Sequence, residues 1–205
     1  MILNNIFDAI YVINIDSEVD KWKLVKSELE RNHITNYTRF SGVIIDGEST
    51  VKSRNLGCTT SHVNIIKEVK RLGKENVLIF EDDVMFDDRI HDYIDIINNF
   101  IKDNVWDLFY LGGNHEGNVE KVNDNIMRVN KTKTTHAYAI NKTCFDNIIN
   151  WNINMPVDDM LIKHIQRKKN SYCIYPRLAL QRPGYSNIMN GFRDHTKVLK
   201  DDESI

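Results

Sequence analysis

Cysteines are scarce in this sequence, and their number excludes one class of protein. The 205 residues contain three cysteines, Cys58, Cys144 and Cys173, which lie far apart. A disulfide framework normally requires an even number of cysteines in a shorter, secreted chain. We therefore expect all three thiols to be reduced, as is typical of a cytoplasmic protein.

Long apolar runs are also absent. No run approaches the roughly 20 apolar residues that span a bilayer as a helix. The apolar segment at residues 2–15 is interrupted by asparagine and aspartate, and it lacks a basic start and a small-residue cleavage site. We expect neither a membrane span nor a signal peptide.

An excess of charge of either sign is missing as well. Lys and Arg number 27 and Asp and Glu number 29, which gives a net charge of -2. This balance lacks the basic footprint of a nucleic-acid-binding protein, so we expect no nucleic acid partner. The 41% hydrophobic and 27% charged residues form an ordinary globular mixture. The length suits one α/β domain, which we expect at residues 1–190, with a polar C-terminal tail at 191–205.

Apolar, β-rich runs alternate with helical periodicities along the chain. They predict strands at residues 9–13, 37–40, 76–80, 106–111, 126–129, 135–140, 171–175 and 178–181. Helices are expected from near Ser17, from Thr59 or Thr60 to Gly73, and over residues 90–101, 142–151 and 156–167. The alternation predicts an α/β fold with a mostly parallel central sheet flanked by helices. Residues 126–129 and 135–140 are also compatible with a hairpin.

Three carboxylates, Glu81, Asp82 and Asp83, follow the clearest predicted strand, residues 76–80. Ligands of parallel sheets bind beyond the carboxyl ends of the strands. Negative charge crowded at a strand end costs free energy unless a cation balances it, and Mg²⁺ or Mn²⁺ prefers oxygen ligands. Side chains two apart in an extended segment share a face, so Glu81 and Asp83 could bind one ion while Asp82 points away. The alternative is a solvated acidic turn that caps the next helix.

Asp158 and Asp159 follow Pro156 at the start of a predicted helix. The helix dipole favours acidic residues there, and this explanation is sufficient by itself. The functional alternative is that one of these carboxylates is a general base that takes the proton from an acceptor hydroxyl.

The segment from Arg54 to His62 combines an arginine, a glycine and hydroxyl residues where a helix is expected to begin. Backbone N–H groups there would bind phosphate with help from Arg54, although an ordinary capped helix start has the same composition. Cys58 and His62 are four residues apart and could hold a metal or form a nucleophile pair, but the sequence shows no third ligand nearby. His195 could close a metal site, although a solvated histidine is the simpler interpretation.

Taken in chain order, these segments resemble glycosyltransferase family 25, which includes bacterial lipopolysaccharide galactosyltransferases and collagen hydroxylysine galactosyltransferases. The matching segments are residues 11–16, 20–22, 57–62, 78–84, 106–112, 135–140, 156–159 and 175–176, with Gln181. The sequence departs from the family pattern at two places. Asp20-Lys21-Trp22 stands where the family commonly has Asp-Arg-Arg, and Ser186-Asn187 stands where many members have Ser-Asp.

The resemblance implies a GT-A-like fold, a UDP-sugar donor, Mn²⁺ (or Mg²⁺) and inversion at the anomeric carbon. It implies that Glu81 and Asp83 hold the metal and that Asp158 faces the acceptor as the catalytic base. Motif and resemblance together give a set of expected donor-binding residues: Ile13, Asn14, Asp16, Arg54, Ser61 and Asp82. We therefore expect transfer of galactose or glucose to a glycan or hydroxylysine-type acceptor.

Two other functions are compatible with acidic strand ends. A metal-dependent phosphohydrolase is also an α/β enzyme, but the chain has no strand-terminal Asp-x-Asp followed by Thr or Val that would supply a phosphoryl nucleophile. A catalytically inactive sugar- or nucleotide-binding module would keep the acidic residues only as turn chemistry.

Overall fold

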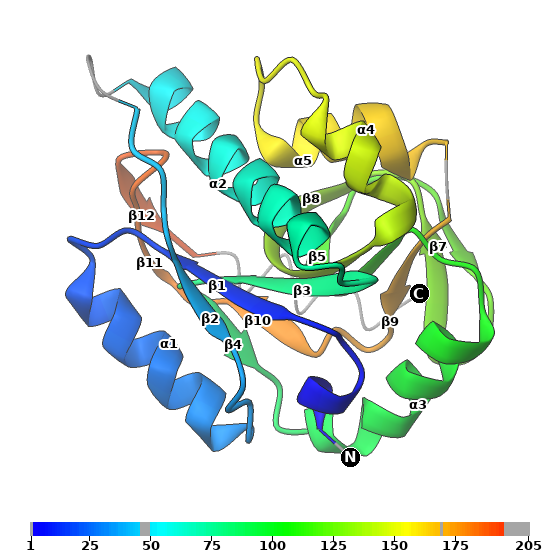
Figure 1. Ribbon diagram of the computed structural model, residues 1–205. Helices are drawn as coiled ribbons and strands as arrows, with labels where there is room; N and C mark the ends of the chain where they lie inside the picture. The colour runs from blue at the N-terminus through cyan, green and yellow to red at the C-terminus, as the bar shows by residue number, and fades with distance from the viewer. Residues whose placement is uncertain (1, 46–49, 169, 195–205) are drawn as a thin grey trace.

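The computed structural model describes residues 2–45, 50–168 and 170–194, which fold around an eight-stranded sheet (Figure 1). The strands lie in the order β2-β1-β3-β8-β5-β9-β7-β6. Their bounds are β1 Ile10–Asn14, β2 Thr38–Ser41, β3 Asn76–Glu81, β5 Leu108–His115, β6 Val119–Lys121, β7 Ile126–Val129, β8 Thr132–Asn141 and β9 Ser171–Ile174. His195 lies outside the described residues.

The sheet is mixed, but most of its strands run in one direction. β1 is parallel to β2 and β3, and β5 is parallel to β9. β8 is antiparallel to both β3 and β5, and β7 is antiparallel to both β9 and β6. Six of the eight strands therefore share one direction, which confirms the predicted α/β fold with a mostly parallel central sheet.

The hairpin considered for residues 126–129 and 135–140 is wrong. Both segments are strands, but β7 pairs with β6 and β9, whereas β8 pairs with β3 and β5. β5 and β9 lie between them in the sheet. The apolar pattern predicts that a segment is extended, but the partner depends on strands that come from elsewhere in the chain.

Helices cover both faces of the sheet (Figure 1). Those on one face are α2 Val51–Arg71, α4 Phe145–Ile149 and α5 Val157–Leu161, and those on the other are α1 Val19–Arg31 and α3 Ile90–Asp103. Short η1 (Leu3–Asn5) and η2 (Lys142–Cys144) turns and a π-helical turn, η3 (Ile162–Gln166), complete the helical segments. Alternate residues of β3 enter the two cores, with Leu78 and Phe80 on one face and Val77 and Ile79 on the other. This burial on both faces explains the continuous apolar run.

The second long helix begins eight or nine residues earlier than the sequence suggests. Thr50 caps α2, because its Oγ1 accepts a hydrogen bond from Ser53 N at 3.1 Å while Thr50 N donates to Ser53 Oγ at 3.0 Å. Inside the helix, the hydroxyls of Thr59, Thr60 and Ser61 donate to carbonyls four residues earlier instead of capping its start. Both interpretations of residues 54–62, an ordinary capped helix start and a phosphate site at a helix entrance, are therefore wrong.

Two small sheets complete the fold. β4 (Val84–Phe86) pairs antiparallel with β10 (Ala179–Gln181), so that Gln181 lies opposite Val84 and next to the end of β3. β11 (Gly184–Ser186) pairs with β12 (Gly191–Arg193), which is where the expected tail begins. Among the described residues, no helix combines the length and apolar character that a membrane crossing requires.

Gly112 allows β10 to approach β5, and this approach positions Gln181. A Cβ atom at Gly112 would lie 1.9 Å from the carbonyl oxygen of Ala179, which is backbone and cannot rotate away. We expect Gly112→Ala to lower the free energy of unfolding by about 3 kcal/mol, the upper end of the usual cost of overpacking. Urea denaturation measures this, with Gly184→Ala as the control because a Cβ there meets nothing within 4 Å. Equal midpoints for the two variants would contradict the prediction.

Candidate functional site

A cavity of about 320 Å³ opens at the carboxyl ends of β1 and β3, where ligands of α/β sheets usually bind. Its wall is built from the end of β1, the loop after β2, the first half of α2, the turn after β3 and residues 181–188. Segments that are far apart in the sequence therefore meet at one place.

Seven of the nine site residues expected from the sequence line this cavity. They are Ile13, Asn14, Arg54, Ser61, Glu81, Asp82 and Asp83. Asp16 and Asp158 are not part of its wall. Ser186 and Asn187, where the sequence departs from the family pattern, also line the cavity.

The acidic segment turns sharply at the cavity. Glu81 is the last residue of β3, and Asp82 and Asp83 form the turn that leads into β4. All three side chains line the cavity. The expectation that Asp82 points away is therefore wrong, because extended backbone ends at Glu81 and strand alternation does not continue through a turn.

Glu81 is held by groups from two other elements. Its Oε1 accepts a hydrogen bond from Thr135 Oγ1 at 2.5 Å and lies 3.5 Å from Nε2 of His62. Burial raises the pKa of Glu81, but the interaction with His62 and the Thr135 hydrogen bond outweigh it, and the pKa lies below its ordinary value. Glu81 is therefore a carboxylate at neutral pH.

Asp83 is the residue of the acidic turn with an unsatisfied carboxylate oxygen. Its Oδ2 accepts a hydrogen bond from Gln181 Nε2 at 2.9 Å, whereas its buried Oδ1 has no hydrogen-bond partner among the described residues. Burial, and then the negative charges of Glu81 and Asp82, raise the pKa of Asp83 to about 7. A cation beside Asp83 would satisfy the bare oxygen and balance the charge.

Asp82 belongs to a chain of hydrogen bonds that the sequence does not reveal. Asn14 Nδ2 donates to Asp82 Oδ2 at 2.6 Å, and Asn14 Oδ1 accepts from Arg39 Nη2 at 2.6 Å. Burial raises the pKa of Asp82, although the Asn14 hydrogen bond lowers it. The guanidinium of Arg39 lies 4.8 Å from the ring centroid of Trp22, which holds it in place.

Arg39 also explains the position of Asp16. Arg39 Nη2 lies 3.1 Å from Asp16 Oδ1, and Ser41 Oγ donates to Asp16 Oδ2 at 2.6 Å. The Asp16 side chain is 69% exposed, so it lies at the rim of the site and not on the cavity wall. Sequence reasoning missed Arg39 because its segment shows only strand periodicity, and its alignment with β1 depends on the parallel pairing.

Arg54 and Ser61 join other parts of the wall together. Arg54 Nε donates to the carbonyl oxygen of Ile188 at 3.0 Å, which ties α2 to residues 181–188. Ser61 Oγ accepts from Val43 N at 2.8 Å and donates to Gly57 O at 2.9 Å. Arg54 and Ser61 thus connect α2 to two other segments of the cavity wall.

Asp158 lies beside the cavity wall, near the thiol of Cys58, whose pKa its charge helps to raise. Its carboxylate accepts from Asp159 N at 2.8 Å and from Thr134 N at 3.4 Å, and Lys133 Nζ lies 3.7 Å away. Burial raises the pKa of Asp158, and the charge of Lys133 opposes that shift. A half-buried carboxylate with a raised pKa is suited to accept a proton.

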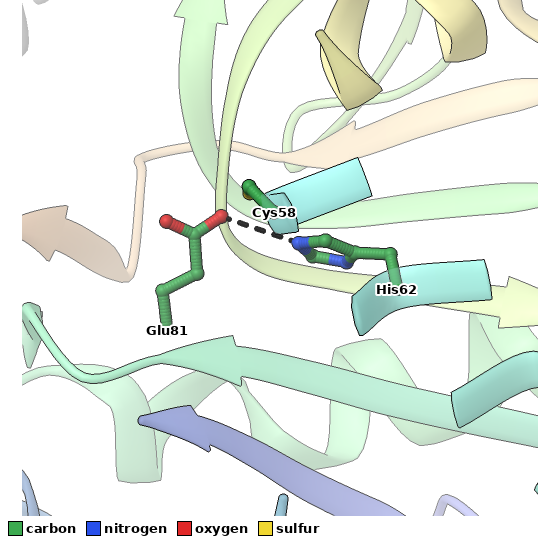
Figure 2. Close-up of side chains that lie close together, drawn as sticks. All are labelled: Cys58, His62 and Glu81. Carbon is green, nitrogen blue, oxygen red and sulfur yellow. Dashed lines mark ion pairs between the residues drawn. The ribbon is translucent and has the colours of Figure 1, made fainter. Parts of the chain in front are cut away.

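In the folded chain, Glu81 lies close to Cys58 and His62 and is the third potential ligand that the sequence does not show. Figure 2 shows Cys58 and His62 on α2 with Glu81 from β3 facing them. One potential ligand atom from each of the three lies within 4.8 Å of the others, the only such group of three among the described residues. The sequence separation of 19 residues between His62 and Glu81 hides this contact.

The residues at the cavity suit a divalent cation. Glu81 and Asp83 supply carboxylate oxygens, and one Asp83 oxygen is buried without a partner among the described residues. Mg²⁺ and Mn²⁺ are hard ions that prefer such oxygen ligands. The site therefore fits the metal that the family resemblance implies.

The raised pKa of Asp83 predicts a pH-dependent stability. Its folded pKa of about 7 exceeds the ordinary value of 3.8, so ionisation of Asp83 destabilises the metal-free fold progressively as the pH rises between those values. We expect Asp83→Asn to raise the melting temperature of metal-free protein by a few degrees at about pH 8, and by less at about pH 5. Thermal unfolding at both pH values measures this, with exposed Asp88→Asn as the control. A gain that is equal at the two pH values would contradict the assignment.

A comparison with protein families finds a match over most of the chain. The model of "Glycosyltransferase family 25 (LPS biosynthesis protein)" matches residues 7–150. No curated protein matches the sequence significantly.

Three solved structures are similar to this chain. The first is a glycosyltransferase involved in the glycosylation of the major capsid of PBCV-1, with 11% identity, a TM-score of 0.49 and coverage of 96% of this chain and 98% of that one. The second is A197 from STIV, with 11% identity, a TM-score of 0.48 and coverage of 86% and 94%. The third is a UDP-glucose pyrophosphorylase complexed with UDP-glucose, with 10% identity, a TM-score of 0.45 and coverage of 81% and 72%.

The family match contains most of the cavity wall. Residues 7–150 include the end of β1, the whole of α2 and the acidic turn, whereas Asp158 and residues 181–188 lie beyond it. Because the matched region covers well over half of the chain and includes the acidic turn, the chain belongs to glycosyltransferase family 25.

Proposed function

We propose that this protein transfers galactose or glucose from a UDP-sugar to an acceptor hydroxyl, with help from Mn²⁺ or Mg²⁺ and with inversion at the anomeric carbon. The observation that supports this most strongly is the convergence of Glu81, Asp82 and Asp83 on one cavity at the end of β3. The proposed acceptor is a glycan or a hydroxylysine-type side chain. Residues 1–190 would form the glycosyltransferase domain of a cytoplasmic protein.

The cavity offers separate surfaces for the parts of the donor. Ile13 and residues 43–45 provide an apolar wall for the nucleoside, with Asn14 fixed beside it by Arg39 and Asp16 at the rim. Lys21 and Arg54 also line the cavity and supply positive charge for the diphosphate. Asp82 is oriented by Asn14 and would position the donor between these surfaces.

Glu81 and Asp83 would hold the divalent ion, because their carboxylates line the cavity and one Asp83 oxygen is otherwise unsatisfied among the described residues. When bound, such an ion neutralises the charge that develops on a departing diphosphate. Thr135 and Gln181 each donate a hydrogen bond to one of these carboxylates and so fix their orientation. This preorganisation lets the site stabilise charge without rearranging during the reaction.

Asp158 is the proposed general base. An inverting displacement requires a base on the opposite side of the sugar from the leaving group. Asp158 lies in the first turn of α5, which packs against α2, and its carboxylate is not part of the cavity wall. Its Oδ1 and Oδ2 are held by the backbone N–H groups of Asp159 and Thr134, so the carboxylate has the fixed orientation that a general base would need.

A donor screen tests the proposal. The purified full-length protein would be incubated without acceptor with UDP-galactose, UDP-glucose or GDP-mannose, each with Mn²⁺, Mg²⁺ or a chelator, and products would be measured by mass spectrometry. We expect slow, metal-dependent hydrolysis of a UDP-hexose and little reaction with GDP-mannose. Parallel incubations would contain a simple phosphate ester.

The alternatives give different results in the same screen. Phosphate released from the ester would favour a phosphohydrolase. If no donor reacts, and if the melting temperature responds to neither UDP nor metal, the transferase proposal is refuted in favour of an inactive binding module.

A further inference from the structure

Cys58, His62 and Glu81 form a cluster with three different ligand atoms. Cys58 and His62 are four residues apart on α2 and therefore project from the same face of the helix (Figure 2). Glu81 reaches them from the end of β3. The sulfur, nitrogen and oxygen atoms of the cluster all lie within 4.8 Å of one another.

The histidine in this cluster is buried and has an unsatisfied nitrogen. His62 is 1% exposed, and its Nε2 has no hydrogen-bond partner among the described residues, although Glu81 Oε1 lies 3.5 Å away. Its other nitrogen, Nδ1, lies 2.9 Å from the hydroxyl oxygen of Tyr138. Metal-binding histidines have this arrangement, because a hydrogen bond at one ring nitrogen orients the other toward the ion.

The charge around the cluster also favours a cation. Burial, and then the negative charges of Glu81, Asp158, Asp83 and Asp82, raise the pKa of the Cys58 thiol. These are four acidic side chains around a half-buried thiol. A positive ion at the cluster would therefore be attracted by every neighbouring carboxylate.

The types of ligand atom in the cluster determine which metal ion fits it. A thiolate and an imidazole suit Zn²⁺ and disfavour Mg²⁺, which prefers oxygen ligands in octahedral geometry. Tetrahedral zinc places its ligand atoms about 3.2–3.8 Å apart. His62 Nε2 and Glu81 Oε1 already lie 3.5 Å apart, so the Cys58 sulfur, within 4.8 Å of its partners, is the atom that would need to approach, by up to about 1 Å. Rotation of the half-buried Cys58 side chain can supply much of that movement.

We propose that Cys58, His62 and Glu81 form a three-ligand Zn²⁺ site that is separate from the ion proposed at Asp83. Cys58 and Glu81 line the cavity, so the fourth position of a tetrahedral ion would face it and remain open to water or ligand. Zinc replaces the proton of the Cys58 thiol, and that proton passes to solvent. Glu81 has a second carboxylate oxygen, which leaves it able to contact an ion at the acidic turn as well.

Cobalt provides a test that does not depend on sugar transfer. Metal-free, full-length protein would be titrated with Co²⁺, which replaces Zn²⁺ and gives a thiolate-to-metal charge-transfer band when sulfur is a ligand. We expect the band to saturate at about one equivalent and to disappear when Zn²⁺ is added. Because the readout is spectroscopic, failure of the transferase proposal would leave this result unaffected.

Matched cysteine variants identify the ligand. Cys58→Ser should abolish the charge-transfer band and weaken Zn²⁺ binding at least about tenfold. Cys144→Ser is the control, because a serine hydroxyl can keep the hydrogen bond that Cys144 Sγ makes to Asp107 Oδ1. Thermal unfolding would verify that both variants fold. If Cys58→Ser does not fold, Cys58→Ala would be used in its place.

Three outcomes would overturn the zinc site. They are the absence of a charge-transfer band in the wild-type protein, an unchanged band in the folded Cys58 variant, and equal loss of the band in Cys144→Ser. A band that depends on Cys58 alone supports the assignment.

Discussion

Replacement of Asp83 with alanine is expected to reduce hexose transfer to less than a tenth of the wild-type turnover while the protein remains folded. The Asp83 carboxylate lines the cavity, and its Oδ1 has no hydrogen-bond partner among the described residues, as expected of a metal ligand. A metal supplies several kcal/mol of charge stabilisation in reactions of this type. Since 1.36 kcal/mol corresponds to a tenfold change in rate, the loss should be about 1,000-fold.

The measurement is steady-state turnover of the UDP-hexose identified by the donor screen, with circular dichroism to verify folding. Asp88→Ala is the matched control, because Asp88 lies five residues away along the chain but its side chain is 92% exposed and outside the cavity. The control should keep wild-type activity. If Asp83→Ala retains more than about a tenth of wild-type turnover, Asp83 does not hold a metal that the reaction requires.

Asp158→Asn is expected to lower turnover strongly and to leave donor binding nearly unchanged. Asp158 is outside the cavity wall, so its loss should change the affinity for UDP by less than about twofold. A general base contributes about 10²- to 10⁴-fold to the rate, and asparagine cannot accept the proton. The expected result is therefore a fall in kcat of at least about 100-fold.

The pH profile separates a base from a merely structural group. Burial raises the pKa of Asp158, so the wild-type kcat/KM should increase with pH through that raised pKa, and this acidic limb should be absent in Asp158→Asn. Asp159→Asn is the control, because its side chain is 41% exposed and pairs with the same Lys133. Equal losses of kcat and UDP affinity in Asp158→Asn would show that Asp158 is not the base.

Several features of the site follow from local sequence. The apolar run at residues 76–80 predicts a buried strand, and the charge of residues 81–83 predicts an acidic strand end. Both are present, and the carboxylates meet a cavity where α/β topology expects one. Asn14, one of the expected donor-binding residues, ends the neighbouring parallel strand and therefore fits the same rule.

Other features depend on partners that are distant in the chain. Glu81 contacts Thr135, Asp83 contacts Gln181 and Asn14 contacts Arg39. Each contact crosses between elements whose pairing the local pattern does not specify, as the mistaken hairpin at β7 and β8 shows. The start of α2 was missed for a related reason. Gly57 suggested a helix boundary, but it lies inside α2. Glycine is needed there because a Cβ would lie 2.4 Å from the carbonyl oxygen of Val43.

Composition and periodicity alone specified an α/β chain with reduced cysteines and an acidic turn after its central strand, because charge, side-chain volume and backbone propensity act over a few residues. Packing in three dimensions set the chemical state of those acids. Burial beside two other carboxylates raises the pKa of Asp83 to about 7, whereas His62 and Thr135 keep Glu81 ionised despite its burial. Desolvation and the field of neighbouring charges depend on which atoms lie within a few ångströms, and only the folded chain brings those atoms together.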